Sequence, residues 1–561
     1  MRKRAVVVVP FIAAIFLLLF LAIGLHRSFH GTKSNGSGDD NSGFSWPWKN
    51  APALADNPPS PSTVSVLTYH NDLARTGQNL EEKTLRPGNV NSSGFGKLGF
   101  LEVDGLVDAE PLYVSNLLVA GRAHNVVFAA TEHDSVYAFD ADSLAQLWRV
   151  TVLGPDETPS DDRNCGQVSP EIGITSTPVI TYDGDRGTIY LVAMSKDADG
   201  NYFQRLHALD IATGAEMSGS PATIGATYPN LRGQTSFDPK EYKERASLLL
   251  LDGVVYTSWA SHCDQGDYTG WVIGYSAATL EQVQVLNVTP NGSDGAIWMS
   301  GAGPAADPQG YIYVLDGNGT FDSTLNPAGF PIHGDFGNGF LKLAPSGTKL
   351  TVADYFDMHD TDAESRQDLD LGSGGALVLP DLKDDAGNIW QLAVGAGKDK
   401  RIYVANRNAM GKFSTPKDNA IYQKIDHAFV GGVWAMPAYS AGTVYIGAVN
   451  DSLKAFSIAN ARLLPKPASK TAAIFAYPGT TPSISANGSS DAIVWAVEAH
   501  GDDAGVLHAY DASNLANELY NSNQAGIRDV FADNKYITPM IANGKVFIGT
   551  RTGVMVFGLL H

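Results

Sequence analysis

The chain has 561 residues, 44% of them apolar, with 58 glycines and a formal net charge of −20 at pH 7. This length is ample for a core, and few long helical patterns occur, which favours one large all-β domain behind an N-terminal extension. The acidic balance argues against a nucleic-acid partner, because binding a phosphate backbone needs clustered Lys and Arg.

The N-terminal region is predicted to be a membrane anchor. Arg2, Lys3 and Arg4 precede an uncharged apolar run over residues 5–25, which is long enough to cross a bilayer as a helix. The basic flank predicts that the N-terminus stays in the cytoplasm and the rest of the chain lies outside it. A cleaved signal peptide is the alternative, and the protein would then be secreted. The predicted transmembrane helix, residues 1–25, is the only expected membrane contact.

The next segment, residues 26–62, is rich in Gly, Ser, Asn, Asp and Pro and is predicted to be a flexible linker. The globular domain is therefore assigned to residues 63–561, on the extracytoplasmic side.

A short unit recurs along this domain. Residues 136–148 read VYAFDADSLAQLW, an apolar run, a turn at Asp142 and Ser143, and a second apolar run. Short polar side chains favour turns because they bond nearby backbone, so the unit predicts strand, turn and strand. Weaker copies occupy residues 206–214, 272–280, 339–347, 402–408, 453–458, 507–513 and 554–558.

A second signal precedes each copy: a small residue or Pro followed by an apolar run. It occurs at residues 109–114, 176–180, 302–305, 435–438, 481–484 and 538–541, and without Pro at 245–249 and 374–378. About eight units of roughly 45–70 residues are typical of propeller blades. Such four-stranded blades bury their faces by packing radially. The run at residues 97–103 has no partner of its own, and we expect it to supply the outer strand of the last blade.

The two cysteines, Cys165 and Cys263, can pair in an oxidising compartment. A structural link between neighbouring blades is favoured over a redox role. No Cys-x-x-Cys-His motif occurs, so no covalent c-type haem is indicated. The histidines are scattered without metal-ligand spacing. A metal site assembled from different blades stays open, for example at His359, which lies beside Asp357 and Asp360.

Polar residues concentrate at 298–304, 311–320, 354–360, 368–375 and 394–401. The repeats, in particular VYAFDADSLAQLW, resemble those of the pyrroloquinoline-quinone (PQQ) dehydrogenase-like propellers over roughly residues 64–559. This resemblance implies an eight-bladed ring that holds PQQ and a calcium ion near its axis.

The resemblance also implies roles for individual residues. Trp298 matches the floor beneath the quinone, Asn318 the calcium-binding Asn, and Lys398 the quinone-contacting Lys. The remaining matches are the base, Asp368 or Asp370, and two cofactor contacts, Thr175 and Trp434. Three features depart from the pattern. Cys165 is not followed by a second Cys, and the acidic calcium ligand is matched only by Asp197 or Asp199. Val433 stands directly before Trp434, where the pattern has an Asn.

Removing a hydride from an alcohol requires a base, a cation and an electrophilic quinone, and these residue types supply the first two. We therefore expect an extracytoplasmic quinoprotein-type oxidoreductase that uses PQQ and Ca²⁺ on an alcohol or sugar. The alternative is a non-catalytic propeller scaffold that binds proteins or polysaccharide at the cell envelope. The missing Cys pair and the missing acidic calcium ligand favour that alternative. Asp and Asn also close turns without any catalytic role.

Overall fold

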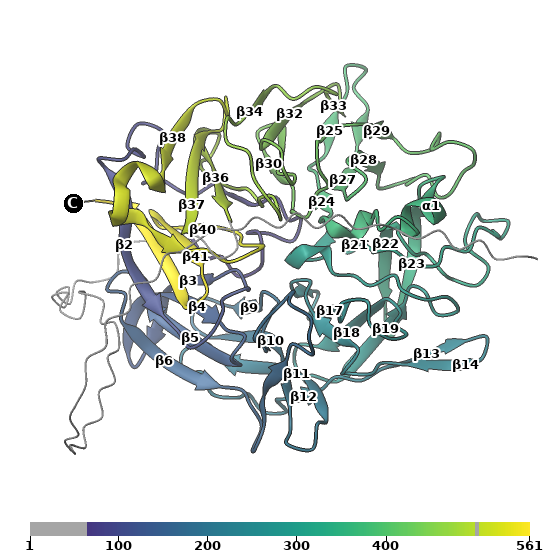
Figure 1. Cartoon of the computed structure of the whole chain (residues 1–561), viewed down its shortest axis with the longest axis horizontal. Helices are drawn as coiled ribbons and strands as arrows, with labels where there is room; N and C mark the ends of the chain where they lie inside the picture. Colours follow the sequence, from purple (N-terminus) through teal and green to yellow (C-terminus); the bar gives the residue numbers. More distant parts are fainter. Residues whose placement is uncertain (1–63, 500–503, 561) are drawn as a thin grey trace, which may run out of the picture. The chain divides into compact units, whose positions relative to one another are not determined.

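The computed structural model describes residues 64–499 and 504–560. Within them, eight sheets follow one another around a ring, and each is a blade of four main strands (Figure 1). The first strand of each blade lies nearest the middle of the ring and the fourth lies at its rim. The predicted all-β, eight-bladed propeller is confirmed.

Blades 1 to 4 follow the chain order of their strands. Blade 1 contains β3 (Leu112–Val119), β4 (Arg122–Ala130), β5 (Ser135–Asp140) and β6 (Gln146–Thr151). Blade 2 contains β9 (Val179–Tyr182), β10 (Gly187–Lys196), β11 (Tyr202–Asp210) and β12 (Ala222–Thr223). Blade 3 contains β16 (Leu249–Leu251), β17 (Val254–Ser261), β18 (Trp271–Ser276) and β19 (Gln282–Asn287). Blade 4 contains β20 (Ala305–Ala306), β21 (Ile312–Leu315), β22 (Phe340–Ser346) and β23 (Lys349–Phe356).

Blades 5 to 8 complete the ring. Blade 5 contains β24 (Leu377–Val378), β27 (Leu392–Ala396), β28 (Ile402–Asn406) and β29 (Gln423–Ile425). Blade 6 contains β30 (Ala438–Ser440), β31 (Thr443–Ile446), β32 (Lys454–Ala459) and β33 (Arg462–Leu463). Blade 7 contains β35 (Ser483–Asn487), β36 (Ser490–Glu498), β37 (Ala504–Asp511) and β38 (Glu518–Asn521). Blade 8 contains β40 (Met540–Ala542), β41 (Lys545–Gly549), β42 (Gly553–Leu559) and β2 (Phe95–Glu102).

Short elements decorate the blades. The added strands are β1 (Gln78–Asn79), β7 (Thr158–Asp161), β8 (Glu171–Ile172), β15 (Tyr242–Glu244), β34 (Ser469–Lys470) and β39 (Phe531–Ala532). Two separate hairpins are β13 (Thr227–Asn230) with β14 (Gly233–Ser236), and β25 (Leu382–Lys383) with β26 (Ile389–Trp390). The helical turns are η1 (Met299–Gly301), α1 (Thr361–Ser365), η2 (Leu371–Ser373) and η3 (Ser522–Asp529).

The repeat copies form the third strand of every blade, and the upstream signals lie directly before or within the first strand. Every residue of β5 is buried, as expected for a strand covered by neighbouring blades on both faces. The predicted ring closure is also confirmed, because β2 pairs antiparallel with β42. Phe95 of β2 packs against Trp495 of blade 7 at a centroid distance of 5.4 Å.

A segment that precedes the blades fills the centre of the ring. Residues 66–79, here called the central segment, hydrogen-bond to all eight blades. The bonds join Val66 to Tyr113, Leu67 to Ile180, Leu73 to Ala306, Ala74 to Val378, Thr76 to Tyr439, Gly77 to Ile484, Arg75 to Leu248 and Asn79 to Ile541. The central segment is therefore a plug that is hydrogen-bonded to every blade of the ring.

The helix predicted over residues 1–25 and the linker over 26–62 lie outside the described residues. Among the described residues, no helix is both long and apolar enough to cross a membrane.

Candidate functional site

A cavity of about 500 Å³ is lined by loops of blades 2 to 8, so it lies on the axis of the ring. Its size is within the range of small-molecule sites, roughly 300–1,000 Å³. The central segment lies beside it, because its Tyr69 is close enough to Arg245, a lining residue, to interact with that charge electrostatically. The plug and the cavity therefore share the axis.

Most of the predicted site residues meet in this cavity. The six that line it are Trp298, Asn318, Asp368, Asp370, Lys398 and Trp434. Thr175 is not among the lining residues; it is buried, and its Oγ1 donates to Glu132 Oε2 at 2.9 Å. Its position therefore gives no support to the predicted cofactor contact.

Lys398 forms the centre of an ion-pair cluster. Its Nζ lies 2.6 Å from Asp368 Oδ1 and 2.5 Å from Asp370 Oδ2. Asn318 holds both carboxylates, since its Nδ2 donates to Asp368 Oδ1 at 2.9 Å and its backbone N–H donates to Asp370 Oδ1 at 2.6 Å. The side chain of Asp368 is 76% exposed, whereas that of Asp370 is 8% exposed. The two carboxylates therefore differ mainly in their contact with water.

Burial raises the pKa of Asp370, and the attraction of Lys398 only partly offsets this effect. Burial works to lower the pKa of Lys398, but Asp370 and Asp368 outweigh it, and the pKa is raised. Lys398 is thus a permanent cation at neutral pH. The raised pKa of the buried Asp370 carboxylate favours its acceptance of a proton.

Two indole rings flank the ammonium group of Lys398. Its Nζ lies 5.7 Å from the ring centroid of Trp298 and 5.8 Å from that of Trp434. Gly317 permits the approach of carboxylate and indole, because a Cβ there would lie 2.9 Å from Asp370 Oδ1 and 3.2 Å from Trp298 Nε1. A side chain at position 317, directly before Asn318, would therefore clash with both groups.

The aromatic wall continues beyond Trp434. Tyr477 packs edge-on against Trp434 at a centroid distance of 5.7 Å, and its hydroxyl is hydrogen-bonded to that of Tyr536. The ring of Tyr536 in turn lies 5.0 Å from the guanidinium of Arg245. One line of contacts thus runs along the cavity from Lys398 to Arg245.

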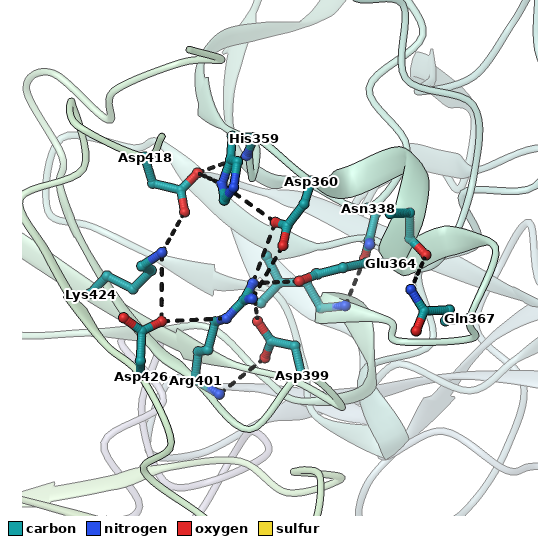
Figure 2. Close-up of polar contacts among 12 residues, drawn as sticks. Asn338, His359, Asp360, Glu364, Gln367, Asp399, Arg401, Asp418, Lys424 and Asp426 are labelled. Atoms are coloured by element: carbon teal, nitrogen blue, oxygen red, sulfur yellow. Dashed lines mark hydrogen bonds and ion pairs between the residues drawn. The ribbon is translucent and has the colours of Figure 1, made fainter. Parts of the chain in front are cut away.

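A charged network holds the two segments that carry the ion-pair cluster (Figure 2). Arg401, three residues after Lys398, contacts Asp360 at 3.2 Å, Asp399 at 3.6 Å and Glu364 of α1. Because α1 precedes Asp368 and Asp370 in the chain, this clamp ties their segment to the turn that carries Lys398. We infer a positioning role for Arg401.

The same network contains His359 and Asp360, two of the three residues that the sequence left open as a metal site, together with Asp418 in place of Asp357. His359 Nδ1 lies 3.0 Å from Asp418 Oδ1 and 3.6 Å from Asp360 Oδ1, as Figure 2 shows. Lys424 Nζ lies 2.7 Å from Asp418 Oδ2, and Arg401 holds Asp360. Since these cations already neutralise the carboxylates, the group is better explained as part of the clamp than as a metal site.

The sequence predicted the disulfide between Cys165 and Cys263 but not its position at the cavity. Cys165 and Cys263 are paired with a Cα–Cα distance of 6.2 Å and join a loop of blade 2 to blade 3, which confirms the predicted link between neighbouring blades. Both cysteines also line the cavity, which the sequence did not indicate. No local motif signals this, because the two residues are 98 positions apart.

Four charged lining residues were missed as site residues: Lys243, Arg245, Asp264 and Lys535. Asp197 and Asp199, the suggested substitutes for the acidic calcium ligand, are not among the lining residues. A signal for Arg245 existed, because residues 245–249 fill a first-strand position where most other blades have a Pro.

The lining residues fit a quinone and a calcium ion. Asn318 Oδ1 is buried without a hydrogen-bond partner, and amide oxygens are ligands that calcium prefers. Asp370 and Asp368 adjoin it as anionic oxygen donors. The faces of Trp298 and Trp434 suit a flat conjugated ligand, and Lys398 lies between them.

No family model and no curated protein matches the sequence. Solved structures do match the fold. Quinohemoprotein alcohol dehydrogenases from Pseudomonas putida HK5 and from Comamonas testosteroni each give a TM-score of 0.57 at 14% identity, over 88% of this chain and 80% of theirs. The chain thus has the eight-bladed propeller fold of the quinohemoprotein alcohol dehydrogenases, as the resemblance of its repeats predicted.

Proposed function

We propose that this chain is a quinoprotein-type oxidoreductase that oxidises an alcohol or a sugar with PQQ and Ca²⁺. One observation carries the proposal: Trp298, Asn318, Asp370 and Lys398, which come from different loops, converge on a single axial cavity. The fold shared with quinohemoprotein alcohol dehydrogenases is compatible with it.

In this proposal Asp370 is the base. Its carboxylate is buried and has a raised pKa, so it suits removal of the proton from a substrate hydroxyl group. A bound quinone would take up the hydride equivalent, and a calcium ion would polarise it. Lys398 places a fixed positive charge beside the reacting groups, Asn318 Oδ1 supplies a neutral metal ligand, and Trp298 supplies a face for stacking.

The test uses the purified full chain with added PQQ and Ca²⁺. We expect saturable quinone absorbance and reduction of an artificial electron acceptor when alcohols or sugars are supplied. Asp370→Asn should lower kcat by about 100-fold or more, the usual contribution of a positioned base. Asp362→Asn, which changes an exposed carboxylate of α1, is the matched control and should leave kcat unchanged. Absence of quinone binding at micromolar concentrations would eliminate the proposal.

A non-catalytic scaffold is the second candidate, and one observation favours it. Both Asp368 and Asp370 are already paired with Lys398, an arrangement that also serves as a structural ion pair. In that case Lys398→Met would lower the melting temperature, and no quinone would bind to the unmodified chain.

We propose that the propeller is anchored to a membrane by residues 1–25 and lies on its extracytoplasmic side. The uncharged run over residues 5–25 after three basic residues supports the anchor. The Cys165–Cys263 disulfide supports an oxidising compartment. Protease accessibility in intact cells tests the side, and the mass of the N-terminal peptide tests whether the anchor is cleaved.

A further inference from the structure

Two buried cations line the cavity apart from the Lys398 cluster. Lys243 is the middle residue of the short strand β15, and Arg245 directly follows the end of this strand. Their exposed fractions are 3% and 7%. Long basic side chains normally extend into solvent, so two of them buried at the same cavity need an explanation.

Neither cation has an ion-pair partner among residues 64–499 and 504–560. Lys243 Nζ donates to the neutral amide oxygen of Gln167 at 3.0 Å. Arg245 has one long contact, from Nη2 to the backbone oxygen of Ser300 at 3.5 Å, and lies over the ring of Tyr536. By contrast, Lys398 in the same cavity has two carboxylates.

Acidic groups act on Lys243 only at longer range. They are Glu132, Asp108 and Asp264, and Arg245 opposes them. Glu132 is itself buried, and burial followed by the repulsion of Asp108 raises its pKa well above the ordinary value. Asp264 is exposed, and its Oδ1 accepts hydrogen bonds from Ser261 and Tyr268. Lys243 and Arg245 therefore have no directly paired carboxylate, although the exposed Asp264 lines the same cavity.

We propose that Lys243 and Arg245 form an anion subsite that takes a carboxylate of the ligand in the cavity. A guanidinium and an ammonium side by side suit a carboxylate, which accepts several charge-assisted hydrogen bonds. The identity of the ligand rests on the proposed function, whereas the subsite itself does not. The carboxylate belongs either to the quinone cofactor or to an acidic substrate such as a hydroxy acid or sugar acid.

The electrostatics of Lys243 in the ligand-free protein are consistent with an anion subsite. Burial, and then the repulsion of Arg245, lowers the pKa of Lys243 to about 8. A bound anion would remove both disadvantages by supplying the missing counter-charge. Without a ligand, these buried cations lack a directly paired counter-charge, and their burial destabilises the fold.

The experiment compares Lys243→Gln, Arg245→Gln and the double variant with the full chain. Lys240→Gln, which removes the same charge at an exposed position outside the cavity, is the control. Without ligand, the Lys243 and Arg245 variants should have the same melting temperature as the unmodified chain or a higher one, because each variant loses an unpaired buried charge. That result also shows that they fold.

Three ligands are then titrated calorimetrically: PQQ, its uncharged trimethyl ester, and gluconate added to PQQ-loaded protein. If the cofactor supplies the carboxylate, PQQ affinity falls at least tenfold in the double variant, whereas ester affinity does not change. If the substrate supplies it, PQQ affinity is unchanged and gluconate affinity falls at least tenfold.

Failure of the proposed function looks different from failure of the subsite. If PQQ does not bind to the unmodified chain, benzene-1,3,5-tricarboxylate is titrated into the ligand-free protein and its variants. Binding that the double variant loses would keep the anion subsite without the quinone. If no carboxylate binds more tightly to the unmodified chain and the Lys240→Gln control than to the double variant, the subsite is refuted.

Discussion

Two buried arginines near the ring axis have opposite surroundings. Arg75, in the central segment, is completely buried and donates hydrogen bonds to Pro304 O at 2.9 Å, Tyr69 O at 2.8 Å and Leu248 O at 3.1 Å. Arg245, in the cavity wall, has a single hydrogen-bond contact, to Ser300 O at 3.5 Å. The same side chain is thus saturated in one place and nearly unpartnered in the other.

This difference in hydrogen bonding distinguishes the central segment, which has a structural role, from the cavity wall, which we propose to bind a ligand. A buried guanidinium with its donors filled links the parts around it, and here Arg75 connects the central segment with blades 3 and 4. A buried cation without partners costs stability, and a ligand offsets that cost. Four predictions test this contrast, from the largest expected effect to the smallest.

Removing the saturated arginine should have the largest effect. Arg75→Met leaves the carbonyl groups of Tyr69, Leu248 and Pro304 without donors, at about 1–3 kcal/mol each, so we expect a loss of about 4 kcal/mol or more in unfolding free energy. Arg245→Met is the matched control and should lose little or nothing. Chemical denaturation measures both. Equal losses in the two variants would contradict the contrast.

The disulfide belongs to the cavity wall but should behave as part of the scaffold. Cys165 and Cys263 close a loop of 98 residues. Replacing both by Ser should lower the unfolding free energy by about 2–5 kcal/mol, because the unfolded chain gains freedom. The shift of the denaturation midpoint reports the change, and an unaltered midpoint would show that the link is not stabilising.

Asn318→Ala should separate binding from stability. The variant loses the unpartnered Oδ1, so Ca²⁺ affinity in the presence of quinone should fall about tenfold or more. The melting temperature should change little by comparison with Arg75→Met. Asn388→Ala, which alters an exposed Asn outside the cavity, is the control. Unchanged calcium affinity in Asn318→Ala would show that the metal ligand is misassigned.

The pH dependence of anion binding should be the smallest effect. Lys243 must be protonated to attract a carboxylate, and its pKa in the free protein is lowered to about 8. Affinity should therefore be full below that pH and decline above it, by less than about tenfold because Arg245 stays charged. Glu132, Asp108 and Asp264 face the same group. In Lys243→Gln this decline should disappear, and a decline that persists would point to another titrating group.

The sequence predicted the fold well because the blade signal is local. Each third strand carries its own apolar run and turn, as in Ser135–Asp140, and the outer strand Phe95–Glu102 showed itself as an apolar run without a neighbour. The positions of Trp298, Asn318 and Lys398 in the cavity followed from the resemblance of their segments.

The remaining features depend on contacts that only the closed ring creates. Residues around Arg75 look like a polar coil, and their hydrogen-bond partners lie in all eight blades. Lys243, Glu244 and Arg245 look like a charged surface stretch, but β15 pairs with β17 and is buried. The partners of such residues lie far away along the chain, so no local pattern shows them.

The most direct measurement is a calorimetric titration of the full chain with PQQ, with and without Ca²⁺. We predict one bound quinone per chain and tighter binding when calcium is present, because Asn318 Oδ1 would hold the ion in the cavity that takes the quinone. No heat of binding and no rise in melting temperature at micromolar quinone would contradict it.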